Sequence, residues 1–215
     1  MESFLFYFLK PIKVLVLLTL LFAISRLNWK NQTHRYVLSL LLVCFFTELF
    51  NSILKSKEQS TNLVTSLSII IHHSLWLLIL ERFVIVKKTA RILLYCFIAF
   101  AVINLFFMEG TDGFDYYTFV IGAFLYILIF IYDSFYKLKK EDFPFFLSNN
   151  YLLLLAPVLF FFGLSFMFGF KSKSITSFII FGDVKLYTFI IYFVNIVYYA
   201  LINLYLYREK KIKNE

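Results

Sequence analysis

Long apolar runs, separated by short segments that carry most of the charges, divide this sequence from end to end. Of 215 residues, 61% are hydrophobic and only 16% are charged, whereas roughly a quarter of an ordinary soluble domain is charged. A soluble fold of this length could not bury so many apolar side chains. The runs also lack the alternation of β-strands. The sequence therefore predicts an all-α, polytopic membrane protein.

The runs predict seven membrane-spanning helices. Most have the ~20 residues that are needed to cross ~30 Å of hydrocarbon. In chain order the predicted spans are 11–25, 36–54, 61–80, 90–108, 115–136, 149–170 and 186–207. Because the connections are short and no internal repeat is visible, we expect residues 1–215 to form a single domain, a bundle of seven transmembrane helices.

The distribution of lysine and arginine predicts the orientation of this bundle. With the N-terminus outside, fourteen of these residues fall on the inner side and seven on the outer side. The inner set is Arg26, Lys30, Arg35, Arg82, Lys87, Lys88, Arg91, Lys137, Lys139, Lys140, Arg208, Lys210, Lys211 and Lys213; the outer set is Lys10, Lys13, Lys55, Lys57, Lys171, Lys173 and Lys185. Positive charge favours the cytoplasmic side. We therefore expect an N-out/C-in, multi-pass protein of a bacterial inner membrane, with no nucleic acid as partner.

The third predicted span carries two adjacent histidines in an apolar setting, within the stretch SIIIHHSLWLLILERF. His72 shares one helical face with Thr61, Thr65, Ser68 and Trp76, and these five residues follow one another at spacings of four, three, four and four. Polar groups in lipid normally turn toward the interior of a bundle. We therefore expect His72 to face inward. His73 points about 100° away, and we expect it to be a packing histidine that tolerates truncation better than His72 does.

Polar residues on two further spans lie at a depth similar to that of His72. The second span carries Glu48 and Asn51, and the last span carries Tyr192 and Asn195. An acid within a membrane is a functional candidate by default, although Glu48 could also form a structural pair with His72 or Lys55. The sequence predicts a cluster of Glu48, His72 and Asn195 in the outer half of the bundle, with Asn51 and Tyr192 nearby.

The sequence lacks the residues that several specific functions of membrane proteins require. The last span, 186–207, has no lysine for a retinal Schiff base, and the chain has no glycine-rich phosphate loop. It has three histidines, of which two are adjacent, and adjacent histidines cannot both face one metal from a regular helix. We expect no metal site and no cofactor.

Three stretches resemble a known group of sequences over the length of the chain. They are HRYVLSLLLVCFFTELFNSIL with Glu48, FPFFLSNNYLLLLAPVLFFFGLSFMFGF, and FVNIVYYALINLYL with Asn195. They are similar to uncharacterised small seven-helix integral membrane proteins of Bacteroidota, which are often encoded near sensor histidine kinases. The resemblance implies a sensory or accessory role and a membrane sensor kinase as partner. The resemblance also implies a third helix that bears Tyr and Glu, and often a histidine one turn before the Asn195 position. This chain departs from that pattern, with His72 and His73 in its third span and Ile191 one turn before Asn195.

Three functions are compatible with these features. The first is a non-enzymatic sensor or accessory protein that binds a small amphiphile, or a partner helix, in the outer half of the bundle. The second is an intramembrane lipid-modifying enzyme that uses Glu48 or His72 as acid or base. The third is a transporter of small solutes or protons. The basic inner segments, which include Lys87 and Lys88, further predict contact with anionic headgroups of membrane lipids.

Overall fold

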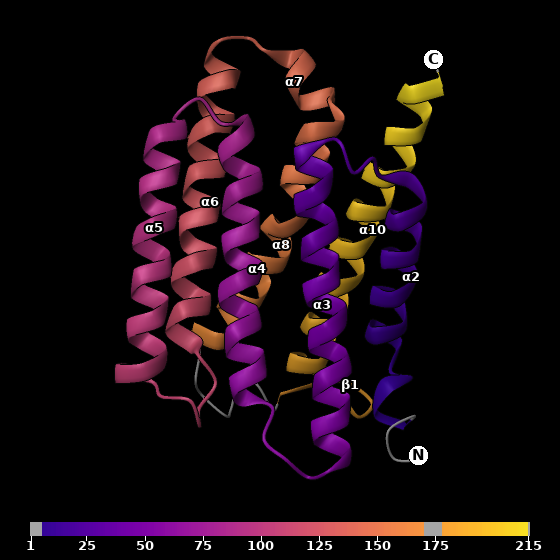
Figure 1. The fold of residues 1–215 in the computed structure, drawn as a ribbon, viewed down its shortest axis with the longest axis vertical. Helices are drawn as coiled ribbons and strands as arrows, with labels where there is room; N and C mark the ends of the chain where they lie inside the picture. Colours follow the sequence, from indigo (N-terminus) through magenta and orange to yellow (C-terminus); the bar gives the residue numbers. More distant parts are fainter. Residues whose placement is uncertain (1–5, 170–177, 215) are drawn as a thin grey trace.

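The computed structural model describes residues 6–169 and 178–214, and the described chain is built almost entirely from helices (Figure 1). The elements are α2 (Pro11–Arg26), α3 (Gln32–Ser56), α4 (Asn62–Phe83), α5 (Lys87–Ile103), the π-helix η1 (Asn104–Met108), α6 (Tyr116–Lys139), α7 (Phe143–Leu147), α8 (Asn149–Gly169), β1 (Ile179–Phe181), β2 (Val184–Lys185) and α10 (Leu186–Asn214). Within the described residues, six helices are long and apolar enough to cross a membrane: α3, α4, α5 with η1, α6, α8 and α10. The prediction of an all-α, multi-pass membrane protein is confirmed.

The remaining long helix, α2, has 16 residues and is about 24 Å long, less than the ~30 Å of a hydrocarbon core. It nevertheless lies alongside the others, in contact with α3 and α10 (Figure 1). Pro11 occupies its first turn, where a missing N–H group has no intrahelical partner to lose. This helix matches the predicted run 11–25.

Six of the helices form a closed ring in the order α2, α3, α4, α6, α8 and α10, in which each helix contacts the next (Figure 1). Helix α5 lies outside this ring, against α4 and α6. As a result α4 contacts α3, α5, α6 and α8, and both of its histidines are buried. The sequence predicted a single inward face for this helix, but the structure surrounds it on several sides.

The outer surface of the bundle is apolar. Phe107 is 82% exposed, and Phe135 and Phe162 are also largely exposed, as are many other large hydrophobic side chains of the helices. A soluble monomer rarely exposes apolar surface on this scale. This surface is suited to contact with lipid.

Three small elements were not predicted from the sequence. They are α7, the π-helical turn η1 and the antiparallel hairpin of β1 and β2. The hairpin turns at Gly182 and Asp183, and Gly182 has a positive φ of 54°, a conformation that glycine adopts at little steric cost. The start of α2 and the end of α10 lie at opposite ends of the bundle, and β1 lies at the same end as the start of α2 (Figure 1). We call these the N-terminal end and the C-terminal end.

A hydrogen-bonded cluster joins η1 to α6 at the N-terminal end. The Asn104 amide donates to the Glu109 carboxylate (2.8 Å), to the Asp115 carboxylate and to the Thr118 hydroxyl (3.1 Å). The backbone N–H of Tyr117 also donates to Glu109, at 2.9 Å. The cluster places two carboxylates beside one another in a partly buried site.

We expect Asp115 to make stability depend on pH. Burial raises the pKa of the Asp115 carboxyl, and the nearby Glu109 raises it further. Because the folded pKa exceeds the unfolded value of about 3.9, the folded state retains the proton longer. The contribution of Asp115 to the unfolding free energy therefore falls as the pH rises from about 4 through the folded pKa, and it does not change further above that pKa.

The substitution Asp115→Asn should remove this slope in melting temperatures recorded in mild detergent between pH 4 and 8. The matched control is Asp112→Asn, which changes an exposed acid in the same connection and should leave the slope intact. An unchanged slope in Asp115→Asn would contradict the assignment.

Candidate functional site

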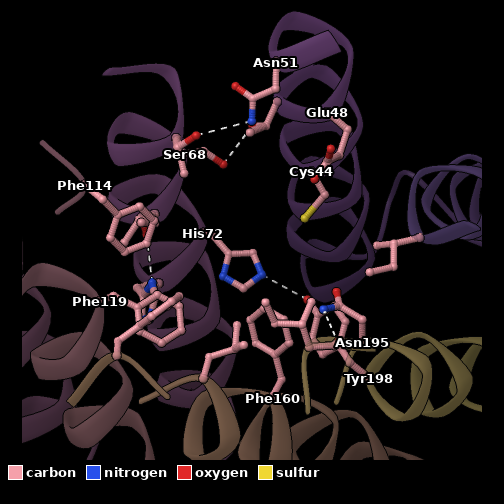
Figure 2. Close-up of a pocket in the computed structure, with 18 of the residues that line it drawn as sticks. Cys44, Glu48, Asn51, Ser68, His72, Phe114, Phe119, Phe160, Asn195 and Tyr198 are labelled. Atoms are coloured by element: carbon pink, nitrogen blue, oxygen red, sulfur yellow. Dashed lines mark hydrogen bonds between the residues drawn. The ribbon is translucent and has the colours of Figure 1, made fainter. Parts of the chain in front are cut away.

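A cavity of about 240 Å³ opens inside the bundle (Figure 2). Its lining includes Asn51 near the end of α3 and Thr65 near the start of α4, which places it in the half nearer the N-terminal end. Its two sides differ in chemistry. Helices α3 and α4 contribute a polar wall: Cys44, Thr47, Glu48, Asn51, Thr65 and Ser68. The opposite wall is aromatic and comes from α6, α8 and the connection before α6: Phe114, Phe119, Phe160 and Phe168.

At the floor of the cavity, His72 and Tyr198 belong to a buried hydrogen-bonded chain that continues behind the lining to Trp76. The indole N–H of Trp76 donates to the Tyr198 hydroxyl oxygen at 3.0 Å, and that hydroxyl lies 3.1 Å from Nε2 of His72. An indole nitrogen can only donate, so the Tyr198 hydroxyl accepts from Trp76 and can donate its own proton in a hydrogen bond to His72. We assign the tautomer that gives the Tyr198 hydroxyl proton an acceptor: Nε2 of His72 accepts from Tyr198, and the ring proton is on Nδ1.

Two groups at this floor keep hydrogen-bonding capacity for a ligand. Nδ1 of His72 has no hydrogen-bond partner among the described residues, and with its proton it is a donor. Asn195 uses its amide N–H to donate to the Ile191 carbonyl, at 2.8 Å. Its carbonyl oxygen remains as an acceptor. Figure 2 shows the His72 ring between the polar and aromatic walls, with Asn195 and Tyr198 beside it.

Glu48 forms an ion pair with Lys13. The sequence had suggested His72 or Lys55 as its partner. Oε2 of Glu48 lies 3.2 Å from Nζ of Lys13, and that ammonium also donates to the Ser52 hydroxyl at 2.7 Å. Lys13 is buried, whereas 32% of the Glu48 side chain is exposed. The expected pairing of Glu48 with His72 or Lys55 is therefore wrong. The reason is that α2 packs against α3 and brings a lysine that we had assigned to the outer segments.

The structure brings four of the five predicted site residues to one cavity. Glu48, Asn51, His72 and Asn195 line it, and Tyr192 does not. On α10, the residue four positions before Asn195 is Ile191, which lies about 40° from Asn195 around the helix, whereas Tyr192 lies about 60° away on the other side. Ile191 therefore occupies the place in the lining that we had expected Tyr192 to take.

His73 packs among aromatic rings, as expected. Its ring stacks on Phe161 at 4.5 Å and meets Phe119 edge-on, and its Nδ1–H donates to the Ile69 carbonyl at 2.9 Å. It is 1% exposed. Both histidines line the cavity, but His73 is the more deeply buried, at 1% exposed against 8% for His72. We therefore expect truncation of His73 to cost more stability than truncation of His72, the reverse of the expectation from the sequence.

Some residues of the site were missed in the sequence. Lys13 was counted only as a topological charge, and Tyr198 was not assigned to the cluster. A signal for Tyr198 was present, because it follows Asn195 by three residues and so lies on nearly the same face of the helix. The aromatic wall had no such signal, since 30 phenylalanines occur throughout the chain.

Within residues 6–169 and 178–214, no three histidine, cysteine, aspartate or glutamate side chains converge as possible metal ligands. Both cysteines, Cys44 and Cys96, are free. No protein-family model matches the chain, and no curated protein or solved structure shows detectable similarity to it.

Proposed function

We propose that this protein is a non-enzymatic sensor or accessory protein of a bacterial inner membrane, and that it binds a small amphiphile in the cavity. One observation carries the proposal: a polar wall faces an aromatic wall across a single interior space. A ligand with a polar group and an apolar body satisfies both walls. The sensory part of the proposal, with a membrane sensor kinase as partner, rests on the resemblance to small seven-helix membrane proteins.

The size of the cavity favours a small ligand over a partner helix. Its 240 Å³ is below the ~300–1,000 Å³ of pockets that hold drug-sized molecules. A helix with its side chains is about 10 Å across and would not fit. The free donor on His72 and the free acceptor on Asn195 suit the hydroxyl or carboxyl group of a short amphiphile.

We further propose that α2 is a seventh span and that the orientation is N-out/C-in. The start of α2 and the end of α10 lie at opposite ends of the bundle (Figure 1), which supports an odd number of crossings. The excess of lysine and arginine on the C-terminal side supports a cytoplasmic location for that end. The cavity then lies in the outer half of the membrane. Reporter fusions after Glu58 should be active outside and fusions after Lys88 inside, and the reverse result would invert this orientation.

The arrangement of the charged groups supports binding rather than acid–base catalysis. The Glu48 carboxylate is engaged by Lys13, and Nε2 of His72 is engaged by Tyr198. No hydrogen bond joins Glu48 to His72 among the described residues. An enzyme that used them as an acid and base pair would need them to act on one substrate bond. Turnover of labelled membrane lipids by the purified protein would contradict the proposal.

Trp76 provides a direct test, because its indole donates to the tyrosine at the cavity floor. In a Trp29→Phe background, Trp76 is the sole tryptophan. The probes are 8-bromooctanol and 8-bromooctanoate, whose bromine quenches indole fluorescence at short range. We expect saturable quenching by at least one probe, at concentrations below those that perturb the detergent micelle.

Two matched substitutions on α10 distinguish the cavity from the lipid-facing surface. Ile191→Phe adds bulk inside the cavity, and Ile196→Phe makes the same change at a residue that is 55% exposed. Saturable quenching should be lost in Ile191→Phe and retained in Ile196→Phe. Equal quenching in the two variants, or quenching that never saturates, would show that the probe reaches Trp76 only from the micelle.

A further inference from the structure

A second hollow, of about 540 Å³, lies at the C-terminal end of the bundle between α3, α4 and α5. Its lining changes along its length. Three basic side chains, Arg82, Lys87 and Arg91, come from the ends of α4 and α5 nearest the C-terminal end of the bundle. Leu78 of α4 and Ile98 of α5 also line it. Leu78 lies about one helical turn deeper than Arg82, and Ile98 about two turns deeper than Arg91. The hollow is thus basic at its rim and apolar toward the middle of the bundle.

The basic groups are only partly neutralised. Arg91 donates to the Glu81 carboxylate from Nε at 2.8 Å and from Nη2 at 2.5 Å, so these two charges form a pair. Arg82 donates to the neutral side-chain oxygen of Gln32. No carboxylate among the described residues pairs with Arg82 or Lys87. Two positive charges therefore remain for a bound anion.

Gln32 also fixes the position of Arg82 across the hollow. Its amide N–H donates to the Tyr36 hydroxyl at 2.7 Å while its oxygen accepts from Arg82. Arg82 is thereby linked from α4 to α3, and it is exposed, as is Lys87 at the first turn of α5. A guanidinium and an ammonium at the two sides of one opening suit a phosphate group.

We propose that this hollow binds an anionic phospholipid, with its phosphate at Arg82 and Lys87 and an acyl chain along Leu78 and Ile98. Basic pockets between transmembrane helices bind such headgroups in general. In the proposed orientation this lipid belongs to the inner leaflet. Only that placement rests on the orientation, and the binding itself depends neither on the orientation nor on the cavity ligand. The proposal separates two neighbouring lysines, because Lys88 is exposed but lies outside the hollow.

The test is native mass spectrometry of the intact protein in mild detergent with added phosphatidylglycerol or phosphatidylethanolamine. We expect wild-type protein to retain phosphatidylglycerol preferentially. Arg82→Gln and Lys87→Gln should each weaken its retention about 5-fold, and the double variant about 25-fold, which corresponds to about 1 kcal/mol per basic residue. Both side chains are exposed, so the variants should fold, and equal melting temperatures without lipid verify this.

The matched control is the double variant Lys88→Gln/Lys139→Gln, which removes the same charge from exposed lysines of the same end. It should retain phosphatidylglycerol as wild type does. Equal losses in the two double variants, or no loss in either, would overturn the site. The assignment to a phospholipid would be overturned if the protein retained the two lipids equally and millimolar inorganic phosphate displaced them. Ile191→Phe should leave lipid retention unchanged, so this test and that of the cavity fail independently.

Discussion

Replacing Gly122 with leucine is expected to have the largest effect of any single change considered for this protein. A Cβ atom at Gly122 would lie 2.6 Å from Cδ2 of His73 and 2.7 Å from Cε2 of Phe97, closer than van der Waals contact allows. The His73 ring cannot withdraw, because it is stacked on Phe161 and packed against Phe119. Helix α6 approaches α4 and α5 here only because residue 122 has no side chain, as small residues do at membrane helix interfaces.

The expected loss is about 3 kcal/mol of unfolding free energy or more, the upper range for overpacking a filled core. Unfolding in mixed micelles by increasing mole fraction of dodecyl sulfate measures it. The control is Gly169→Leu, since nothing lies within 4 Å of a Cβ at Gly169. If leucine at position 122 left the unfolding midpoint unchanged, the close contact of α4 and α6 would be wrong.

His73→Ala supplies a second check on the same contact. Alone it should cost about 3 kcal/mol, as large aromatic deletions in cores do, and more than His72→Ala. Combined with Gly122→Ala it should lose less than the sum of the two single losses, because removing the ring makes room for the new methyl group. Strictly additive losses would show that the two positions do not touch.

Glu48→Gln is expected to lower the unfolding free energy by about 3 kcal/mol, the lower end of the cost of breaking a buried ion pair. The substitution leaves the Lys13 ammonium buried without a counter-charge, beside neutral acceptors such as the Ser52 hydroxyl and, at 3.5 Å, the backbone carbonyl of residue 48. The value is at the lower end because 32% of the Glu48 side chain is exposed, so water partly screens the pair. The same dodecyl sulfate titration measures the loss.

Double variants identify the partner of Glu48. Lys13→Met with Glu48→Gln should recover much of the stability that Glu48→Gln loses, since no unpaired charge is then left buried. His72→Ala with Glu48→Gln should lose the sum of the single effects, because Tyr198, and not Glu48, is the hydrogen-bond partner of His72. Coupling of Glu48 to His72 instead of Lys13 would restore the pairing that the sequence predicted.

The positions of the helices were accessible from the sequence because hydrophobic thickness is a local constraint. A span must be apolar for about 20 consecutive residues, and this is visible without knowledge of the neighbours. The predicted run 36–54 lies within α3, and the run 115–136 matches α6 with shifts of one to three residues. The shared face of Glu48 and Asn51 could be predicted for the same reason, since it depends only on the period of one helix.

Contacts between helices depended on the tertiary structure. The sequence placed Glu48, His72 and Asn195 at a similar depth, and the structure lines one cavity with them. It could not show that α2 would deliver Lys13 to Glu48, or that Tyr198 would bind His72. Both contacts depend on the rotation of each helix about its axis and on the order of helices around the ring. Apolar packing over the whole bundle decides these two quantities, and in a chain that is 61% hydrophobic no local pattern encodes them.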